Sequence, residues 1–195
     1  MPPLRSLCVY CGSRTGSAPL HARAAFAFGE LLAGRGVDLV YGGGRVGIMG
    51  AVADGALAQG GRVIGVIPRG LVDRELAHPG ATELVVVDSM HERKAEMERR
   101  ADAFVALPGG SGTLDELFEV WTWRQLGLHG KPVALLDVGG YWGPLVACLD
   151  HMVREGFLDG AERQGLLVDA DGVRLLDAIV QAPLPSTPRW GGTRA

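Results

Sequence analysis

The sequence predicts an α/β protein with a Rossmann-like, doubly wound parallel sheet that carries helices on both faces. Short apolar runs rich in β-branched residues alternate with amphipathic stretches along nearly the whole chain. The runs are almost continuously apolar, which is typical of parallel strands covered on both faces. Glycine and proline cluster where the runs end, as expected of loops that lead from a strand into a helix.

The strands are expected where the apolar runs fall. In chain order they cover residues 7–10, 37–41, 62–67, 84–87, 103–107 and 133–137, with a weaker final strand at 165–168. Helices are expected between them, where apolar residues recur at helical spacing. In chain order they cover residues 19–33, 47–59, 89–100, 113–125, 141–154 and 171–180.

Length and composition predict one globular domain over residues 1–182, followed by a Pro/Gly-rich tail at 183–195. Of the 195 residues, 47% are hydrophobic and 21% charged, which is enough for a sizeable core. A net charge of −3 argues against a broad basic face that holds nucleic acid. No apolar stretch is long enough to span a membrane and no secretory segment precedes the first strand, so a cytoplasmic location is expected.

The cysteines and histidines predict neither a disulfide framework nor a metal centre. There are three cysteines, and the pair Cys8 and Cys11 has no second pair and no neighbouring histidine beside it. The five histidines are scattered without the spacing of metal ligands. We therefore expect no metal and no cofactor.

Four loops that follow strands are expected to meet at one pocket. They contain residues 12–14, 42–44, 68–70 and 108–110, and each includes glycine. In open parallel sheets the ligand crevice lies at the carboxyl ends of the strands. Residues 42–47 also match the dinucleotide fingerprint, but the next strand ends without the acidic residue that holds a ribose hydroxyl, so NAD is not expected.

Residues 108–116 read Pro-Gly-Gly-Ser-Gly-Thr-Leu-Asp-Glu and join an anion-binding turn to two acids at the start of a helix. Glycines let the backbone approach a ligand, and the free N–H groups of a first helical turn favour an anion. The turn lacks the lysine of a nucleoside triphosphatase loop, so we expect a monophosphate. Asp115 and Glu116 point about 100° apart on a helix, so one is expected to face the pocket while the other serves the helix end.

The helix expected at 89–100 carries Met90 and Met97 on its buried stripe, which places Arg93 beside that stripe. Because this helix starts at the carboxyl end of a strand, Arg93 is expected to reach the pocket. The alternative is an ion pair between Arg93 and Glu96 on a solvated face.

Together these motifs make the chain similar to the LOG family of cytokinin riboside 5′-monophosphate phosphoribohydrolases, whose members are sometimes mislabelled lysine decarboxylases. The resemblance covers nearly the whole chain and rests on motifs at residues 8–13, 39–44 with 46–50, 63–68, 90–97 and 108–116. It implies hydrolysis of the N-glycosidic bond of N6-modified adenosine 5′-monophosphates, and of AMP, to free base and ribose 5-phosphate. It also implies a homodimer. Four apolar residues after the catalytic helix either supply interface area or pack in the core: Trp121, Trp123, Leu126 and Leu128.

The resemblance also implies roles for individual residues. Arg93 and Glu116 fall on the catalytic positions. Glu116 is expected to activate water and stabilise positive charge on the ribose, while Arg93 clamps the nucleotide or balances charge. The expected substrate-binding residues are Gly12, Ser13, Gly43, Gly44, Glu75, Lys94, Gly109, Gly110, Ser111, Gly112, Thr113 and Asp115. Asp115 stands where glutamate is usual and Ser111 where many relatives carry a larger residue, so altered affinity is expected.

Three other functions stay open on the sequence. They are a nucleotide-binding protein without chemistry, a general AMP or purine nucleotide nucleosidase in salvage, and a carrier of another phosphorylated heterocycle such as a pterin cofactor. A pyridoxal-dependent decarboxylase is not expected, because it needs a Schiff-base lysine. The only lysines, Lys94 and Lys131, have no recognisable cofactor-binding context.

Overall fold

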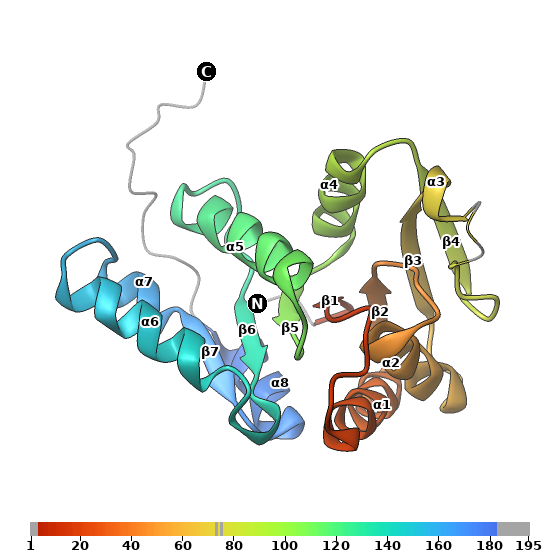
Figure 1. Ribbon diagram of the computed structural model, residues 1–195, viewed down its shortest axis with the longest axis horizontal. Coiled ribbons are helices and arrows are strands. Elements are labelled where there is room, and N and C mark those ends of the chain that lie inside the picture. The colour runs from red at the N-terminus through yellow and green to blue at the C-terminus, as the bar shows by residue number, and fades with distance from the viewer. Residues whose placement is uncertain (1–3, 73, 75, 183–195) are drawn as a thin grey trace.

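Seven parallel strands form one sheet in the computed structural model of this chain, which describes residues 4–72, 74 and 76–182. The strand order is β4-β3-β2-β1-β5-β6-β7 (Figure 1). The strands are β1 (Ser6–Tyr10), β2 (Asp38–Tyr41), β3 (Val63–Pro68), β4 (Glu83–Val87), β5 (Ala103–Ala106), β6 (Val133–Leu136) and β7 (Leu166–Asp169). The predicted Rossmann-like, doubly wound fold is thus confirmed.

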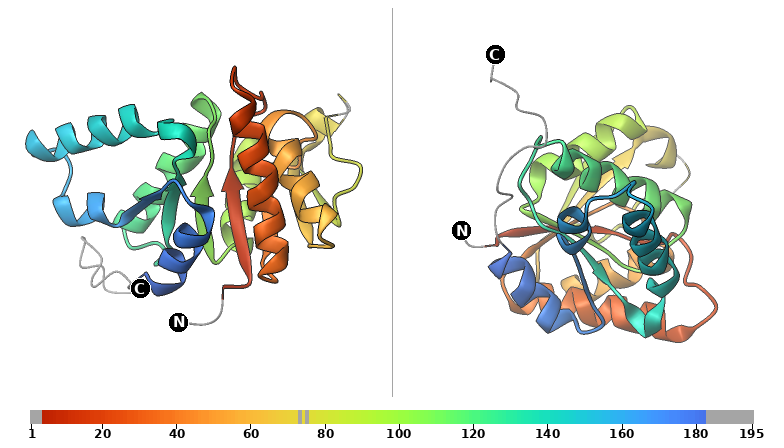
Figure 2. Two further views of the ribbon diagram at one scale, coloured as in Figure 1. Left: turned by 90° about the horizontal axis from the view of Figure 1, so that it is seen from below. Right: turned by 90° about the vertical axis from the view of Figure 1, so that its left-hand side faces the viewer.

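Helices cover both faces of the sheet, as Figure 2 shows from two further directions. On one face lie α1 (Pro19–Gly34), α2 (Gly47–Ala58) and α8 (Gly172–Gln181), and on the other α4 (Met90–Arg100), α5 (Ser111–Gln125) and α6 (Gly143–Arg154). Successive side chains of a strand point to opposite faces. In β1, Leu7 and Val9 therefore pack in the core under the first set of helices, while Cys8 and Tyr10 pack under the second.

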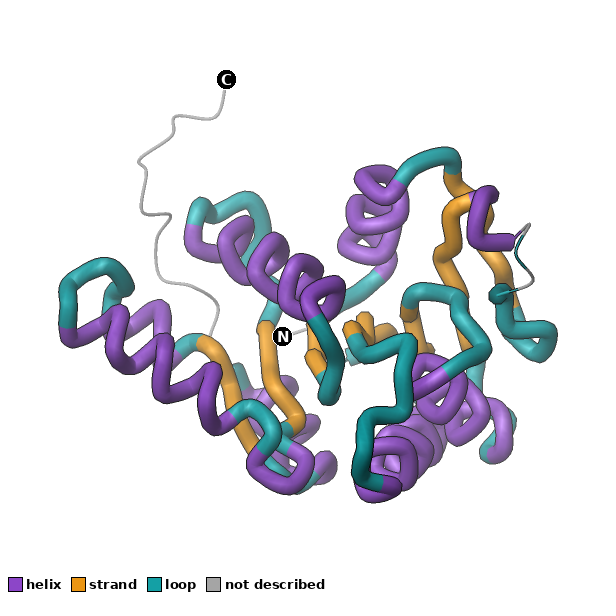
Figure 3. Tube along the Cα trace, in the orientation of Figure 1, coloured by secondary structure: helices purple, strands orange, loops and turns teal. Residues whose placement is uncertain are grey.

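The order of the strands reverses beside β1, since β2 lies on one side of it and β5 on the other. The loops that follow β1 and β5 lead to helices on opposite faces of the sheet, α1 and α5. In open α/β sheets, ligands bind in the space between two such loops. Figure 3 shows the loops that follow β1, β2 and β5 close together near the middle of the sheet. The fold thereby places the expected phosphate-binding loop opposite the loop after β1.

All the strands and helices expected from the sequence are present, and their ends differ from the expected ones by at most two residues. Three short elements were not expected: α3 (Arg69–Val72), α7 (Gly160–Gln164) and the 3₁₀ turn η1 (Val138–Gly140). Each is about one turn long, too short to show a period. None of the described helices is both long and apolar enough to cross a membrane.

Two side-chain predictions meet different outcomes. The prediction that Met90 belongs to the buried stripe of α4 was wrong, because Met97 is fully buried whereas Met90, the first residue of the helix, is 45% exposed. Trp121 packs in the core, while Leu126 and Leu128 are exposed. The tail expected at 183–195 lies outside the described residues.

Candidate active site

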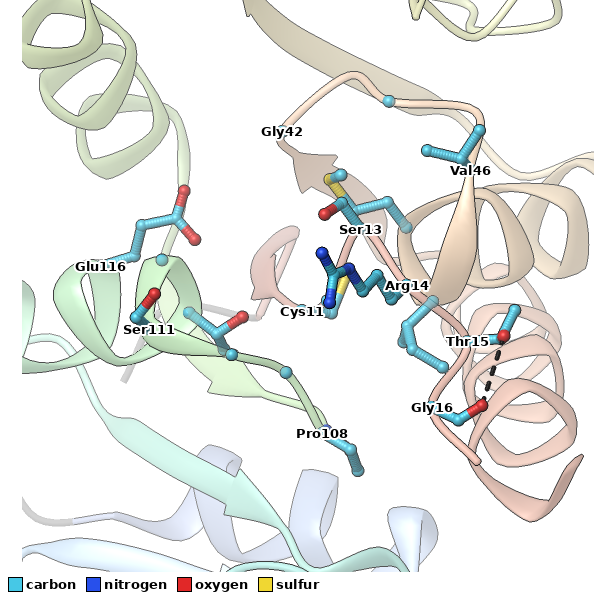
Figure 4. A pocket seen from close by; sticks show the side chains of 18 of the residues that line it. Cys11, Ser13, Arg14, Thr15, Gly16, Gly42, Val46, Pro108, Ser111 and Glu116 are labelled. Carbon is cyan, nitrogen blue, oxygen red and sulfur yellow. Dashed lines mark hydrogen bonds between the residues drawn. The ribbon is translucent and has the colours of Figure 1, made fainter. Parts of the chain in front are cut away.

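A pocket of about 870 Å³ opens at the carboxyl ends of β1, β2 and β5 (Figure 4). The expected meeting of strand-end loops is confirmed for three of the four, those with residues 12–14, 42–44 and 108–110. The expectation for the fourth was wrong. Residues 68–70 do not line the pocket, because the chain turns into α3 there and presents Leu71 instead.

Residues 108–113, called the phosphate turn below, are held in place by their neighbours. The Gly12 N–H donates to the Pro108 carbonyl at 3.1 Å. The Tyr141 hydroxyl donates to the Gly109 carbonyl at 2.5 Å. A Cβ on Gly109 would lie 2.0 Å from Oγ1 of Thr113, so glycine is required there. Helix α5 starts at Ser111, and the N–H groups of its first turn have no partner within the helix. The phosphate turn thus presents free donors at the positive end of a helix dipole.

Arg93 and Glu116, the two residues expected to be catalytic, form the second feature of the pocket and are called the catalytic pair below. Both side chains reach it from helices on the same face of the sheet, and both residues are only 8% exposed. Nη1 of Arg93 lies 3.4 Å from Oε1 of Glu116. Burial raises the pKa of the Glu116 carboxyl, and the positive charge of Arg93 offsets part of that rise.

The guanidinium of Arg93 is fixed by the backbone as well. Its Nε donates to the Val66 carbonyl at 3.1 Å, and its Nη2 donates to the Gly42 carbonyl at 3.2 Å. A Cβ on Gly42 would lie 1.7 Å from Nη2, so the glycine after β2 leaves room for the guanidinium. Only Nη1 is left to face Glu116. The alternative pairing of Arg93 with Glu96 on a solvated face is therefore wrong, because the Arg93 side chain points toward the carboxyl ends of β2 and β3.

Both Asp115 and Glu116 line the pocket, so the expectation that one of them serves the helix end instead was wrong. Glu116 is buried at the pocket, whereas the Asp115 side chain is 63% exposed. Lys94 Nζ lies 3.2 Å from Asp115 and 3.0 Å from Glu119. Burial by itself lowers the pKa of Lys94, but its hydrogen bonds to Glu119 and Asp115 raise that pKa overall. Lys94 is thus a firmly charged group behind Asp115.

Most of the expected substrate-binding residues line the pocket. They are Gly12, Ser13, Gly44, Gly109, Gly110, Ser111, Gly112, Thr113 and Asp115. Gly43 and Lys94 do not line it, and Glu75 lies outside the described residues, so their binding roles stay predictions. Lys94 reaches the pocket only through its ion pair with Asp115.

Sequence reasoning missed Arg14, His21 and Tyr141, which also line the pocket. The rings of His21 and Tyr141 meet edge to face at 5.6 Å. Arg14 stood in one of the recognised glycine loops and could have been identified from that position. No sequence signal marks Tyr141, because it follows a strand whose loop had not been assigned to the pocket.

Thiolate chemistry is disfavoured in this pocket. Cys11 lines it, but burial raises the pKa of the thiol well above its ordinary value and disfavours a thiolate nucleophile. Within residues 4–72, 74 and 76–182, no group of three or more His, Cys, Asp or Glu side chains is placed to hold a metal ion.

Comparison with known proteins gives matches over most of the chain. A family described as possible lysine decarboxylase matches residues 49–179. Cytokinin riboside 5′-monophosphate phosphoribohydrolase LOG of Oryza sativa subsp. japonica is 49% identical over 182 residues, which cover 93% of this chain and 74% of that protein. The enzyme of the same name from Arabidopsis thaliana, LOG7, is 50% identical over 173 residues, covering 88% of this chain and 79% of that protein.

Solved structures share the fold at lower identity. The Moco carrier protein of Chlamydomonas reinhardtii superposes with a TM-score of 0.69 at 22% identity, covering 92% of this chain and 98% of that one. At this sequence identity the similarity shows a shared fold and nothing about function.

Proposed function

Because the chain belongs to the LOG family of cytokinin riboside 5′-monophosphate phosphoribohydrolases, we propose that it hydrolyses the N-glycosidic bond of an N6-modified adenosine 5′-monophosphate. The products are the free base and ribose 5-phosphate. The observation that carries the proposal is the buried catalytic pair, which faces the same pocket as the phosphate turn. A carboxylate for the ribose and donors for a phosphate thus serve one ligand.

In this proposal Glu116 performs the chemistry at the anomeric carbon. Loss of the base builds positive, oxocarbenium-like charge on the ribose, and an adjacent carboxylate stabilises that charge. The same carboxylate orients the attacking water and accepts its proton. A pKa raised by burial makes Glu116 a stronger base than an exposed glutamate.

Arg93 acts mainly on Glu116. Two of its three nitrogens already donate to backbone carbonyls, and the third faces the carboxylate. This arrangement supports a role in keeping Glu116 ionised and oriented, more than a role in clamping the nucleotide. A guanidinium fixed by the backbone also loses little freedom when the substrate binds.

The apolar wall of the pocket favours a substituted base. Its apolar lining includes Val46, Ile67, Leu71, Leu76 and Met90. Such a surface gains free energy from covering a purine and an apolar N6 substituent. Asp115 is exposed enough to accept hydrogen bonds from ribose hydroxyls.

Pyridoxal chemistry has no support from the lysines. Lys94 is engaged by Asp115 and Glu119, and Nζ of Lys131 lies 2.6 Å from Glu98. A Schiff-base lysine has to be free to lose its proton, whereas the hydrogen bonds of Lys94 to Glu119 and Asp115 raise its pKa and favour the charged form.

Relative kcat/KM for N6-isopentenyl-AMP and AMP tests the proposed function. Free base is resolved by chromatography after each nucleotide is incubated with the protein. We expect release from both and preference for the substituted base. Preference for AMP would instead support a general purine nucleotide nucleosidase, and binding without release would support a non-catalytic nucleotide-binding protein.

We also propose a cytoplasmic homodimer. Leu126 and Leu128 are exposed at the end of α5 and offer apolar area for a second copy. Cys8, Cys11 and Cys148 are all free, which suits a reducing compartment. Sedimentation at micromolar concentration and cell fractionation test the two parts, and a monomer or a secreted protein would contradict them.

A further inference from the structure

The charges that line the pocket are balanced before a nucleotide binds. Two arginines, Arg14 and Arg93, face two carboxylates, Asp115 and Glu116. A 5′-phosphate brings up to two negative charges, which a carboxylate pair repels. Binding of the phosphate therefore requires a cation that is not already paired with a carboxylate.

The cations on the α4 side are already engaged. Arg93 donates to two carbonyls and pairs with Glu116, and Lys94 pairs with Asp115 and Glu119. Withdrawing Arg93 would leave the buried Glu116 carboxylate and two carbonyls without their donor, which is costly, and withdrawing Lys94 would break its two ion pairs. Neither is available to a phosphate without that loss.

Arg14 differs from both. It is exposed on the loop after β1, and its side chain extends into the pocket (Figure 4). Within the described part of the chain its guanidinium has no ion-pair or hydrogen-bond partner. A guanidinium suits a phosphate because its planar fork donates to two oxygens at once.

The backbone at Arg14 is held rigidly beside the phosphate turn. The Met49 N–H donates to the Gly12 carbonyl at 3.2 Å, and the Gly12 N–H donates to Pro108 at 3.1 Å. An added Cβ on Gly47 would lie 2.5 Å from the Arg14 nitrogen, which shows how closely α2 packs on this loop. The side chain of Arg14 is thus free while its anchor is fixed across from the anion-binding N–H groups.

We propose that Arg14 binds the 5′-phosphate from the wall opposite the phosphate turn and makes this pocket select phosphorylated nucleosides. The inference rests on the proposed function, since it assumes a nucleoside monophosphate as ligand. The N–H groups of α5 hold one side of the phosphate, and Arg14 neutralises the other. Without Arg14, the pocket lining carries one more negative than positive side chain.

Equilibrium titration of AMP and of adenosine tests the proposal. All proteins carry Glu116→Gln, so that the nucleotide survives the measurement. Arg14→Ala is expected to weaken AMP binding about tenfold or more, as when a charged hydrogen-bond partner is lost, and to leave adenosine binding unchanged. Arg14→Lys should recover part of the loss. Arg154→Ala, which removes the same charge from exposed α6, serves as the matched control and should change neither affinity.

Each result bears on a separate claim. Equal AMP affinity with and without Arg14 would overturn the inference and leave the proposed function standing. Equal weakening of AMP and adenosine would also overturn it, since Arg14 would then shape the pocket without reading the phosphate. Failure of the Glu116→Gln protein itself to bind AMP would overturn the proposed function, and the inference with it.

Discussion

The two ends of the pocket are built from different parts of the chain. At the phosphate turn, backbone N–H groups at the start of α5 lie at the pocket, and hydrogen bonds from Gly12 and Tyr141 hold the turn in place. At the catalytic pair, two buried side chains of opposite charge line the pocket directly. Backbone donors suit binding, because they keep their geometry and their charge at any pH. The side-chain pair suits chemistry, because Glu116 gains or loses a proton.

If the two ends divide binding from chemistry, Glu116→Gln should break only the second. The amide can neither accept the proton of water nor supply negative charge. We expect turnover to fall by about a thousandfold or more, with AMP affinity within a few fold of the parent. Rapid-quench kinetics and titration measure the two quantities. Equal losses of both would show that the ends are not separable.

The pH dependence of kcat/KM sharpens the role of Arg93. Glu116 has to be ionised to act, so activity should fall as the pH drops through its raised pKa. Arg93 lowers that pKa. Arg93→Ala should therefore shift the fall toward higher pH and reduce the maximal rate about a hundredfold or more. An unshifted profile would contradict the view that Arg93 acts through Glu116.

Glu116→Gln should lower activity without lowering the melting temperature. Because burial raises the pKa of Glu116 in the folded protein, its ionisation opposes folding. The protonated carboxyl carries no such cost, so its raised pKa stabilises the folded protein at low pH. This stabilisation is lost as the pH rises through the pKa that Glu116 has in the folded protein. We expect Glu116→Gln to melt no lower than the parent at neutral pH, whereas a clearly lower value would show that the ion pair stabilises the fold.

Gly109→Ala should damage the phosphate end alone. Its Cβ meets Thr113 Oγ1 at 2.0 Å and the Gly12 nitrogen at 2.8 Å, so the phosphate turn has to move. We expect AMP affinity to fall at least tenfold with adenosine affinity little changed. Gly34→Ala is the matched control, since a Cβ there meets nothing within 4 Å. An unaffected affinity in Gly109→Ala would mean that this turn does not hold the phosphate.

The smallest effect is expected from Tyr141→Phe, which removes only the donor to Gly109. Loss of one neutral hydrogen bond is worth about 1 kcal/mol, so KM should rise a few fold while kcat stays near the parent value. A fall in kcat with unchanged KM would assign Tyr141 to the catalytic end.

The same division explains which parts of the site could be predicted from the sequence. The phosphate turn was predictable because its signals are local, with glycines between an apolar strand and a helix at residues 103–120. The seven strands were predictable for the same reason. The partners of Arg93 were not, because Val66 and Gly42 lie 27 and 51 positions away in the chain. Met90 was misread because a methionine at a helix start fits a buried stripe and a pocket wall equally well.

Arg14 and Tyr141 illustrate the remaining gap. Both lie in loops whose side chains follow no period. The glycine loop after β1 could have pointed to Arg14, whereas only the folded structure shows that Tyr141 faces the pocket. The catalytic roles proposed for Arg93 and Glu116 were predicted from the family resemblance, and the structure adds that the two side chains meet.

A product analysis with N6-isopentenyl-AMP and the parent protein tests most directly whether this protein cleaves the N-glycosidic bond. Free base and ribose 5-phosphate are quantified together after a single incubation. We expect equal amounts of the two products and no nucleoside. Release of inorganic phosphate with intact nucleoside, or bound nucleotide that stays unchanged, would contradict it.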